Sequence, residues 1–225
     1  MADHSSALEQ VADFLSRRGV SAPAGFWERV AGAYRTPPRH YHGLDHLCEL
    51  CDRYVEIEAG PGWQQPREVL LAIVFHDAVY VAGRSDNERR SAEMARDLIT
   101  RFIPEAAIDV AFVTQLIRRT AGHGEESAVG LDDDTGHFLD ADMAILAAAG
   151  ERFAEYDRQI AREYSHLPGP IFRRGRRAFF ERLLASEHIF HTPWFRDRHE
   201  SRARANLQRA LGRGPASEAA PAATE

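Results

Sequence analysis

The sequence contains no lysine, and all 28 of its basic residues are arginine. Chemistry that depends on a lysine amine, such as Schiff-base catalysis or the phosphate contact of a P-loop, is therefore excluded. Only two cysteines are present, which is too few for a disulfide framework. Such a low cysteine content is typical of proteins in the reducing cytoplasm. No apolar run approaches the length of about 20 residues that a membrane helix needs, and the start MADHSSALEQ lacks the regions of a secretory signal. We therefore expect a cytoplasmic protein without a membrane partner.

The composition of the 225 residues is that of a globular protein. Hydrophobic residues make up 44% and charged residues 28% of the chain, which supplies enough apolar material for a buried core. The formal net charge is −6, from 28 basic and 34 acidic residues. The most basic stretch, residues 171–213, includes Arg173, Arg174, Arg176 and Arg177, which share a predicted helix with an apolar stripe. We interpret these arginines as a solvated helix face, so a nucleic-acid partner is not expected.

Helical periodicity dominates the chain, and strand-like alternation of apolar and polar residues is scarce. Residues 66–77 are apolar on most sides and predict a buried central helix. Further patterns predict, among others, helices over 106–119, 138–148 and 171–190. The sequence thus predicts an all-α, single-domain helical bundle of about nine helices.

No internal repeat or shift in composition divides the chain, so we expect one helical domain over 1–212. Residues 213–225, which end in GPASEAAPAATE, have the low complexity of a disordered tail. The acidic run 132–134 is interpreted as a solvated loop. The oligomeric state is not readable from the sequence.

Two segments place histidine beside carboxylate in positions suited to metal binding. His42 and His46 are four residues apart and would share one face of a helix. His76 and Asp77 directly follow the apolar run LLAIVF, where an imidazole and a carboxylate are costly to desolvate unless they are paired or bound to metal.

A third segment contributes two acids, Asp140 and Asp142, at the start of a predicted apolar helix. Imidazole and carboxylate together favour Zn²⁺, Mn²⁺, Fe²⁺ or Ni²⁺ over Cu⁺ or Ca²⁺. Two histidines and two acids would provide four ligands and leave positions open for water and substrate. Such an open arrangement is typical of a catalytic metal site.

The order of these residues, His46, then His76-Asp77, then a later Asp, resembles the H…HD…D order of the HD-domain superfamily of metal-dependent phosphohydrolases. The separations, 30 residues from His46 to His76 and 65 from Asp77 to Asp142, fit an all-helical HD core. One subgroup of predicted phosphohydrolases in that superfamily is similar to five ordered segments of the chain: RHYHGLDHL, AIVFHDAVY, DNERRSAEMA, LDADMAIL and YDRQIAREY. The resemblance implies an HD-type domain whose core covers about 34–165.

The resemblance also implies a ligand set for one divalent transition metal: Mn, Zn, Fe, Ni or Co, with Mg as a further candidate. His46 matches the first metal-binding histidine, and His76 and Asp77 match the paired ligands. The last ligand should be the Asp that precedes the hydrophobic pair of an Ala-Asp motif, which favours Asp142. Spacing alone does not separate it from Asp140, which we interpret as the N-cap of the following helix.

Other site residues are suggested by analogy. The tract YHGLDH resembles the YHN…H stretch of cyclic-nucleotide phosphodiesterases, so His42 would protonate the leaving oxygen. Arg39 is a candidate for a phosphate contact, because a guanidinium binds two phosphate oxygens at once. Glu88 could orient a metal-bound water or bind a second metal, and His123 could be an additional ligand. For Arg39 and Glu88 a surface ion pair is an equally good interpretation, and His42 could be a surface or supporting residue.

The function these residues predict is a metal-dependent phosphohydrolase in which metal-activated water cleaves a phosphate ester of a small molecule, with nucleotides among the candidates. Asp77 would be both ligand and catalytic residue. One alternative is a catalytically silent HD fold that binds a nucleotide or phosphate. Another, an HD-type oxygenase, needs two irons and more histidine ligands than the sequence places.

The pair Cys48 and Cys51 forms a CxxC close to His46 and invites a zinc or redox interpretation. Cys51 is in phase with the apolar residues Leu47 and Tyr54 of a predicted helix, and no second CxxC exists to complete a four-ligand site. Apolar packing is therefore the preferred interpretation.

Overall fold

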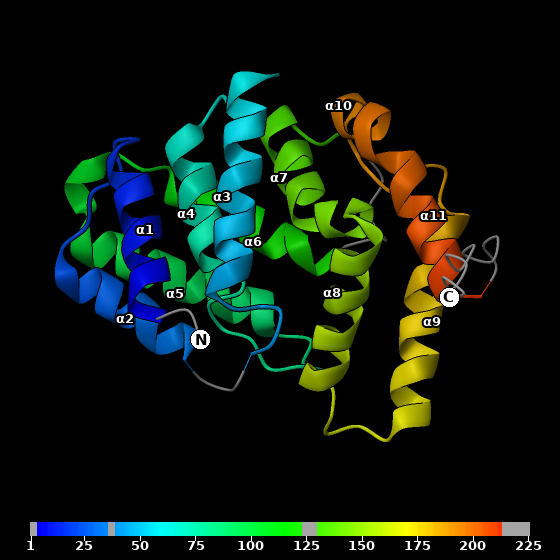
Figure 1. Cartoon of the computed structure of the whole chain (residues 1–225). Helices are drawn as coiled ribbons and strands as arrows, with labels where there is room; N and C mark the ends of the chain where they lie inside the picture. Colours follow the sequence, from blue (N-terminus) through cyan, green and yellow to red (C-terminus); the bar gives the residue numbers. More distant parts are fainter. Residues whose placement is uncertain (1–3, 36–38, 123–129, 213–225) are drawn as a thin grey trace, which may run out of the picture.

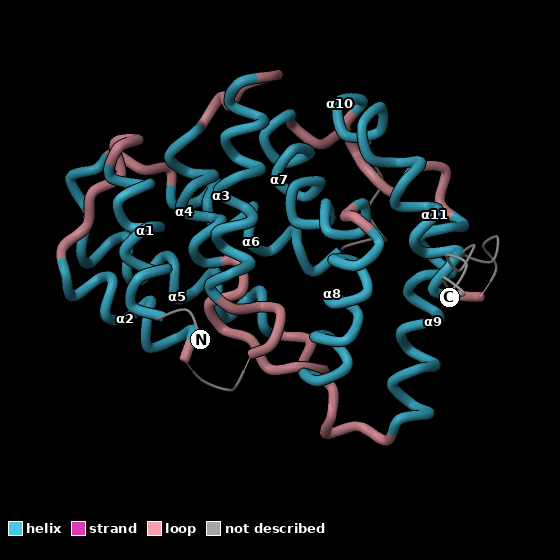
Figure 2. Tube along the Cα trace, in the orientation of Figure 1, coloured by secondary structure: helices cyan, strands magenta, loops and turns pink. Residues whose placement is uncertain are grey.

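The computed structural model describes residues 4–35, 39–122 and 130–212, and every regular element in these ranges is a helix (Figures 1 and 2). The all-α prediction is confirmed, although the described ranges contain ten α-helices of ten or more residues where about nine were expected. These helices are α1 (His4–Ser16), α2 (Ala24–Tyr34), α3 (Leu44–Ala59), α4 (Pro66–Phe75), α5 (Asn87–Phe102), α6 (Val110–Arg119), α7 (Asp133–Met143), α8 (Gly150–Glu163), α9 (Gly169–Ala185) and α11 (Ser201–Ala210).

Shorter helical segments connect them: η1 (Pro104–Ala106), η2 (Thr120–Gly122), η3 (Ala144–Ala147), α10 (Pro193–Phe195) and η4 (Arg196–Glu200). None of the described helices is long and apolar enough to cross a membrane. The predicted tail 213–225 and the candidate ligand His123 lie outside the described residues.

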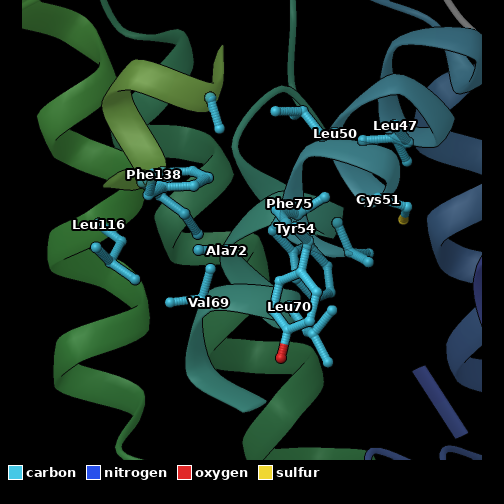
Figure 3. Close-up of a cluster of buried hydrophobic side chains, with 14 of the residues drawn as sticks. Leu47, Leu50, Cys51, Tyr54, Val69, Leu70, Ala72, Phe75, Leu116 and Phe138 are labelled. Atoms are coloured by element: carbon cyan, nitrogen blue, oxygen red, sulfur yellow. The ribbon is translucent and has the colours of Figure 1, made fainter. Parts of the chain in front are cut away.

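Helix α4 is the centre of the bundle, as its apolar sequence predicts. Every residue from Val69 to Phe75 is at most 1% exposed, and the helix packs against α3, α5 and α6. Figure 3 shows Leu70 and Phe75 of this helix among side chains of its neighbours, including Tyr54 of α3 and Phe138 of α7. Burying one large apolar side chain contributes about 1.5–3 kcal/mol, so the buried side chains of α4 together hold this helix firmly in place. His76 and Asp77 follow it directly.

The start of α6 differs from the prediction, which placed it at residue 106. The helix begins at Val110, because Ala107 adopts a left-handed conformation with φ of 50° and Asp109 caps the helix instead. The Asp109 carboxylate accepts a hydrogen bond of 3.0 Å from the backbone N–H of Phe112.

The start of α7 also differs, since the helix begins five residues before the predicted Phe138. Asp132 caps it by accepting from the backbone N–H of Thr135 at 2.8 Å. The prediction that 132–134 form a solvated loop was therefore wrong. Asp134 is 2% exposed and accepts hydrogen bonds from the backbone N–H groups of Gln64 and Gln65.

Helices α8 and α9 form an antiparallel pair on the C-terminal side of the molecule (Figure 1). Helix α9 ends at Ala185, five residues before the predicted end, and α11 packs against it and against η3. The arginines of α9 were predicted to lie on one solvated face. Four of the five arginines of α9 are exposed, but Arg176 is partly buried, stacks on aromatic rings and forms an ion pair with Asp157 of α8 at 2.9 Å.

Candidate metal centre

Four potential ligand atoms converge from three parts of the fold. His46 lies in the first turn of α3, His76 and Asp77 follow the end of α4, and Asp142 lies at the end of α7. The Nε2 atoms of His46 and His76 are 3.2 Å apart. Asp142 Oδ1 is 3.0 Å from His46 Nε2 and 3.6 Å from His76 Nε2. Asp77 Oδ2 is 3.0 Å from His76 Nε2 and 4.0 Å from His46 Nε2.

These separations fit the ligands of a single ion. Atoms bound to one ion at about 2.1 Å lie about 3.0–3.4 Å apart when adjacent and about 4.2 Å apart when opposite. The five measured separations run from 3.0 to 4.0 Å. His46, His76 and Asp77 thus form a group that could hold a metal ion, and Asp142 is placed to complete it.

His76 is oriented for metal binding by the helix that precedes it. Its Nδ1 is 2.9 Å from the carbonyl oxygen of Ile73, so Nδ1 carries the proton and donates to that oxygen. The lone pair of the neutral ring then lies on Nε2, which faces the other three candidate ligands. The residue is 1% exposed, which removes water as a competitor for that lone pair.

The charges of the group shift the pKa values of His76 and Asp77. Burial works against the charged imidazole of His76, but the carboxylates of Asp77 and Asp142 outweigh it and raise the pKa of His76 to about 9. Burial would also raise the pKa of Asp77, but the charges of His76 and His42 hold it well below its usual range. Without a metal ion, a protonated His76 therefore offsets part of the charge of these carboxylates at neutral pH.

The two acids of α7 that were considered as the last ligand have different surroundings. Asp142 faces the histidines, whereas Asp140 accepts hydrogen bonds from the backbone N–H groups of His191 and Thr192, at 2.6 and 2.8 Å, and from the Thr192 hydroxyl at 2.7 Å. Burial raises the pKa of Asp140 to about 6, although these bonds act to lower it. The interpretation of Asp140 as an N-cap was wrong, because it lies inside α7. Asp142 is the better-placed ligand of the two.

His42 lies beside the four ligand atoms, in the turn before α3. Its Nδ1 is 2.7 Å from Oε2 of Glu163, the last residue of α8, and its ring stacks on Tyr80 with centroids 4.1 Å apart. The other carboxylate oxygen of Glu163 accepts the backbone N–H groups of residues 40, 41 and 42 at 2.8–3.0 Å. One buried carboxylate thus fixes both the loop and the imidazole ring that it carries.

Glu163 was not predicted as a site residue. A signal was present in the sequence, because Glu163 continues the buried stripe of Phe153, Tyr156 and Ile160 along α8. An acid on the apolar side of an amphipathic helix needs a partner, but the sequence does not show that the partner lies 121 residues away.

The side chain of Arg39 binds the backbone around the candidate ligands. Its guanidinium donates to the backbone carbonyls of Ala33, His42, Asp77 and Ala78 at 2.5–3.1 Å. These bonds tie the end of α2, the His42 turn and the turn after α4 together. Because Nη1 and Nη2 are bonded within the protein, Arg39 has a structural role, and the phosphate contact stays a prediction.

The remaining candidates are not brought to the group. Glu88 lies in the first turn of α5, is partly exposed and is not among the ligand atoms that cluster around His46. Cys51 is buried and Cys48 half-buried within α3, and burial raises the pKa of both thiols. Raised pKa values disfavour the thiolate that metal binding needs, in agreement with the packing interpretation.

A cavity of about 510 Å³ opens beside the candidate ligands. His42 and Asp142 form part of its wall, and most of the rest is aromatic or aliphatic. Cavities of this size hold small organic molecules. A molecule in it would therefore reach both the ligand group and His42.

Neither a protein-family model, nor a curated protein, nor a solved structure matches the chain. The resemblance to the HD-domain superfamily stays a prediction based on the motifs.

Proposed function

We propose that the protein is a metal-dependent phosphohydrolase that cleaves a phosphate ester of a small molecule. The observation that carries the proposal is the convergence of the ligand atoms of His46, His76, Asp77 and Asp142 next to a cavity that also contains His42. A divalent metal bound there would act as a Lewis acid toward the phosphoryl oxygens and activate water as the nucleophile. Mn²⁺, Zn²⁺, Fe²⁺, Ni²⁺ and Co²⁺ suit a mixed imidazole and carboxylate set, and Mg²⁺ is a further candidate.

In this proposal His42 provides the proton for the leaving alcohol. Burial lowers the pKa of His42, but the charge of Asp77 and the hydrogen bond and charge of Glu163 outweigh it, and the net pKa is raised from its usual value. Its Nδ1–H donates to Glu163, so the proton on Nε2 is the one available for transfer. Glu163 is a positioning residue here, because its carboxylate favours the charged form of the ring and its hydrogen bond holds the ring in one orientation.

The experiment is metal analysis followed by a substrate screen. The protein is purified without chelator, its metal content is measured, and phosphomonoesters, nucleotides and cyclic nucleotides are tested with Mn²⁺, Co²⁺, Ni²⁺ and Mg²⁺. We expect bound metal and turnover of at least one class, with both lost in His46→Ala. A protein that takes up no metal and releases no phosphate would overturn the proposal. Tight nucleotide binding without product would instead indicate a binding module.

A further inference from the structure

The cavity beside the candidate ligands has a mostly apolar wall, which is unexpected next to a site that would bind phosphate. Besides Tyr41, His42 and Tyr80, it is lined by α7 and η3, by α8 and by α9, the two helices that lie side by side in Figure 1. Six aromatic rings line it, those of Tyr41, Tyr80, Tyr156, Tyr164, Phe172 and Phe179. Ile145, Ile160, Leu167 and Ile171 add aliphatic surface.

Charged groups in this wall are few and are already balanced. Among the described residues that line the cavity, only Asp142, His42 and Arg176 carry ionisable acid or base groups, apart from tyrosine hydroxyls. Arg176 is paired with Asp157 at 2.9 Å, and its guanidinium lies 4.4–5.6 Å from the ring centroids of Tyr156, Phe179 and Phe180. This described lining therefore has no cluster of cations that could hold a chain of phosphates, and its other polar groups are the hydroxyls of four tyrosines, set among apolar side chains.

We infer that this cavity receives the alcohol part of the substrate, and that this alcohol is apolar and ring-bearing. The inference rests on the proposed function, which puts the phosphoryl group at His46, His76, Asp77 and Asp142. From there the ester oxygen faces His42, and the remainder of the molecule extends into the cavity. A volume of about 510 Å³ accepts one or two fused rings, whose faces and edges would contact the aromatic side chains. The substrate class is a monophosphate ester of such an alcohol.

The first test compares monophosphates of primary alcohols, so that the acidity of the leaving group is nearly constant. Benzyl phosphate and 2-naphthylmethyl phosphate are compared with glycerol 3-phosphate and ribose 5-phosphate, using the metal-loaded protein, and ATP is added as a triphosphate with a different leaving group. We expect kcat/KM for the two arylmethyl esters to exceed that for the sugar and glycerol esters by at least about tenfold, since each buried methylene is worth about fourfold. Equal or better turnover of ATP or ribose 5-phosphate would overturn the inference and leave the proposed function intact.

The second test measures binding without turnover. The probe is 2-naphthylmethylphosphonate, which cannot be hydrolysed, and its dissociation constant is measured by calorimetry with Mn²⁺ present. Ile171→Asp puts a charge into the wall at a side chain that is 58% exposed, so the fold is spared. Val55→Asp is the matched control, because Val55 is an exposed apolar residue of α3 away from the cavity.

We expect Ile171→Asp to weaken binding of the naphthyl probe at least about tenfold, and Val55→Asp to leave it unchanged. Gly175→Leu is a second variant, because a Cβ atom added there meets no atom within 4 Å and the leucine side chain would reduce the free space in the cavity. If these variants weaken binding of the naphthyl probe but no ester is turned over, the proposed phosphohydrolase function fails. The inference that the cavity binds an apolar ring then still holds. If binding of the probe is no tighter than that of methylphosphonate, the cavity assignment is wrong.

Discussion

The carboxylate of Glu163 lies 2.7 Å from Nδ1 of His42, although 121 residues separate them in the chain. The carboxylate is almost fully buried, and its second oxygen accepts three backbone N–H groups of the loop that carries His42. Despite burial, which acts in the other direction, these bonds and the charge of His42 lower the pKa of Glu163 to about 2. The carboxylate therefore stays ionised through the neutral range, and its hydrogen bond fixes the orientation of the His42 ring.

Glu163→Gln tests this relationship. The amide keeps the shape but loses the charge, and its N–H₂ would face Nδ1 and favour the opposite tautomer of His42. We expect turnover of any substrate found to fall by about 10–100-fold, with metal content unchanged. The basic limb of the pH–rate profile should move to lower pH, because the carboxylate that helps to raise the pKa of His42 is gone.

The matched control is Glu155→Gln in the same helix, where the carboxylate is partly exposed and pairs with Arg158. It should change neither the rate nor the profile. If Glu163→Gln lowered the melting temperature but left the pH profile in place, Glu163 would be a structural residue only.

Asp140 and Asp142 offer a second pair of variants, because they are two residues apart on α7 and have different partners. Asp142→Asn should reduce metal affinity by more than about 100-fold, since even outer partners of ligands contribute about 10–100-fold. Asp140→Asn should lower metal affinity far less than Asp142→Asn does, but destabilise the fold by about 1–3 kcal/mol, because an N–H₂ group would then face a buried N–H donor. Metal titration and thermal unfolding measure the two effects. The reverse pattern would make Asp140 the ligand.

Metal uptake should release a proton. In the metal-free protein the pKa of His76 is about 9, so the ring is charged at neutral pH, whereas a ligand must be neutral. We expect release of about one proton per metal at about pH 7.5, and an affinity that rises about tenfold per pH unit up to about pH 9. Calorimetry in buffers of different ionisation enthalpy measures the count. His188→Gln, on the surface, should not alter it, and a count near zero would contradict the predicted state of His76.

The same pKa predicts how the metal-free protein responds to base. A raised pKa in the folded state means that protonated His76 contributes stability below about pH 6.5, and that this contribution is lost as the pH rises through about 9. The melting temperature in chelator should therefore fall between neutral pH and about pH 10, and bound metal should flatten this fall.

Arg39→Lys tests whether Arg39 stabilises the fold or contacts a phosphate. The lysine amine cannot reproduce the four bonds to carbonyl groups in three segments, so we expect a destabilisation of about 2 kcal/mol in chemical denaturation. Arg35→Lys, at the exposed end of α2, should be neutral. A large rise in KM with unchanged stability would support the predicted phosphate contact.

The sequence predicted the helical class well, because apolar spacing in α3, α4 and α8 directly reflects which faces are buried. Helix starts were harder to predict. The start of α6 depends on the backbone conformation of Ala107, and the start of α7 depends on the cap at Asp132. A few local bonds thus decide where each helix begins, and the spacing of apolar residues does not reveal them. The buried role of Asp134 depends on a distant loop and leaves no periodic signal.

The candidate ligands could be named from their motifs, since each is marked locally by an apolar run or a neighbouring acid. The supporting residues could not. Glu163 and Arg39 act through hydrogen bonds to segments far away in the chain, and a single sequence contains no distances. The aromatic cavity was missed for the same reason, because its walls are assembled from helices that look like ordinary amphipathic ones.

Asp140 fixes the loop at His191 and Thr192 to the helix that also presents Asp142. Residues 191 and 192 therefore support the helix that carries the candidate ligand Asp142, although neither is among the candidate ligands. A chain shortened to end before this loop would keep all four ligands in its sequence and yet expose a carboxyl group whose partners had been cut away. Truncation at this point should therefore reduce metal affinity as well as stability.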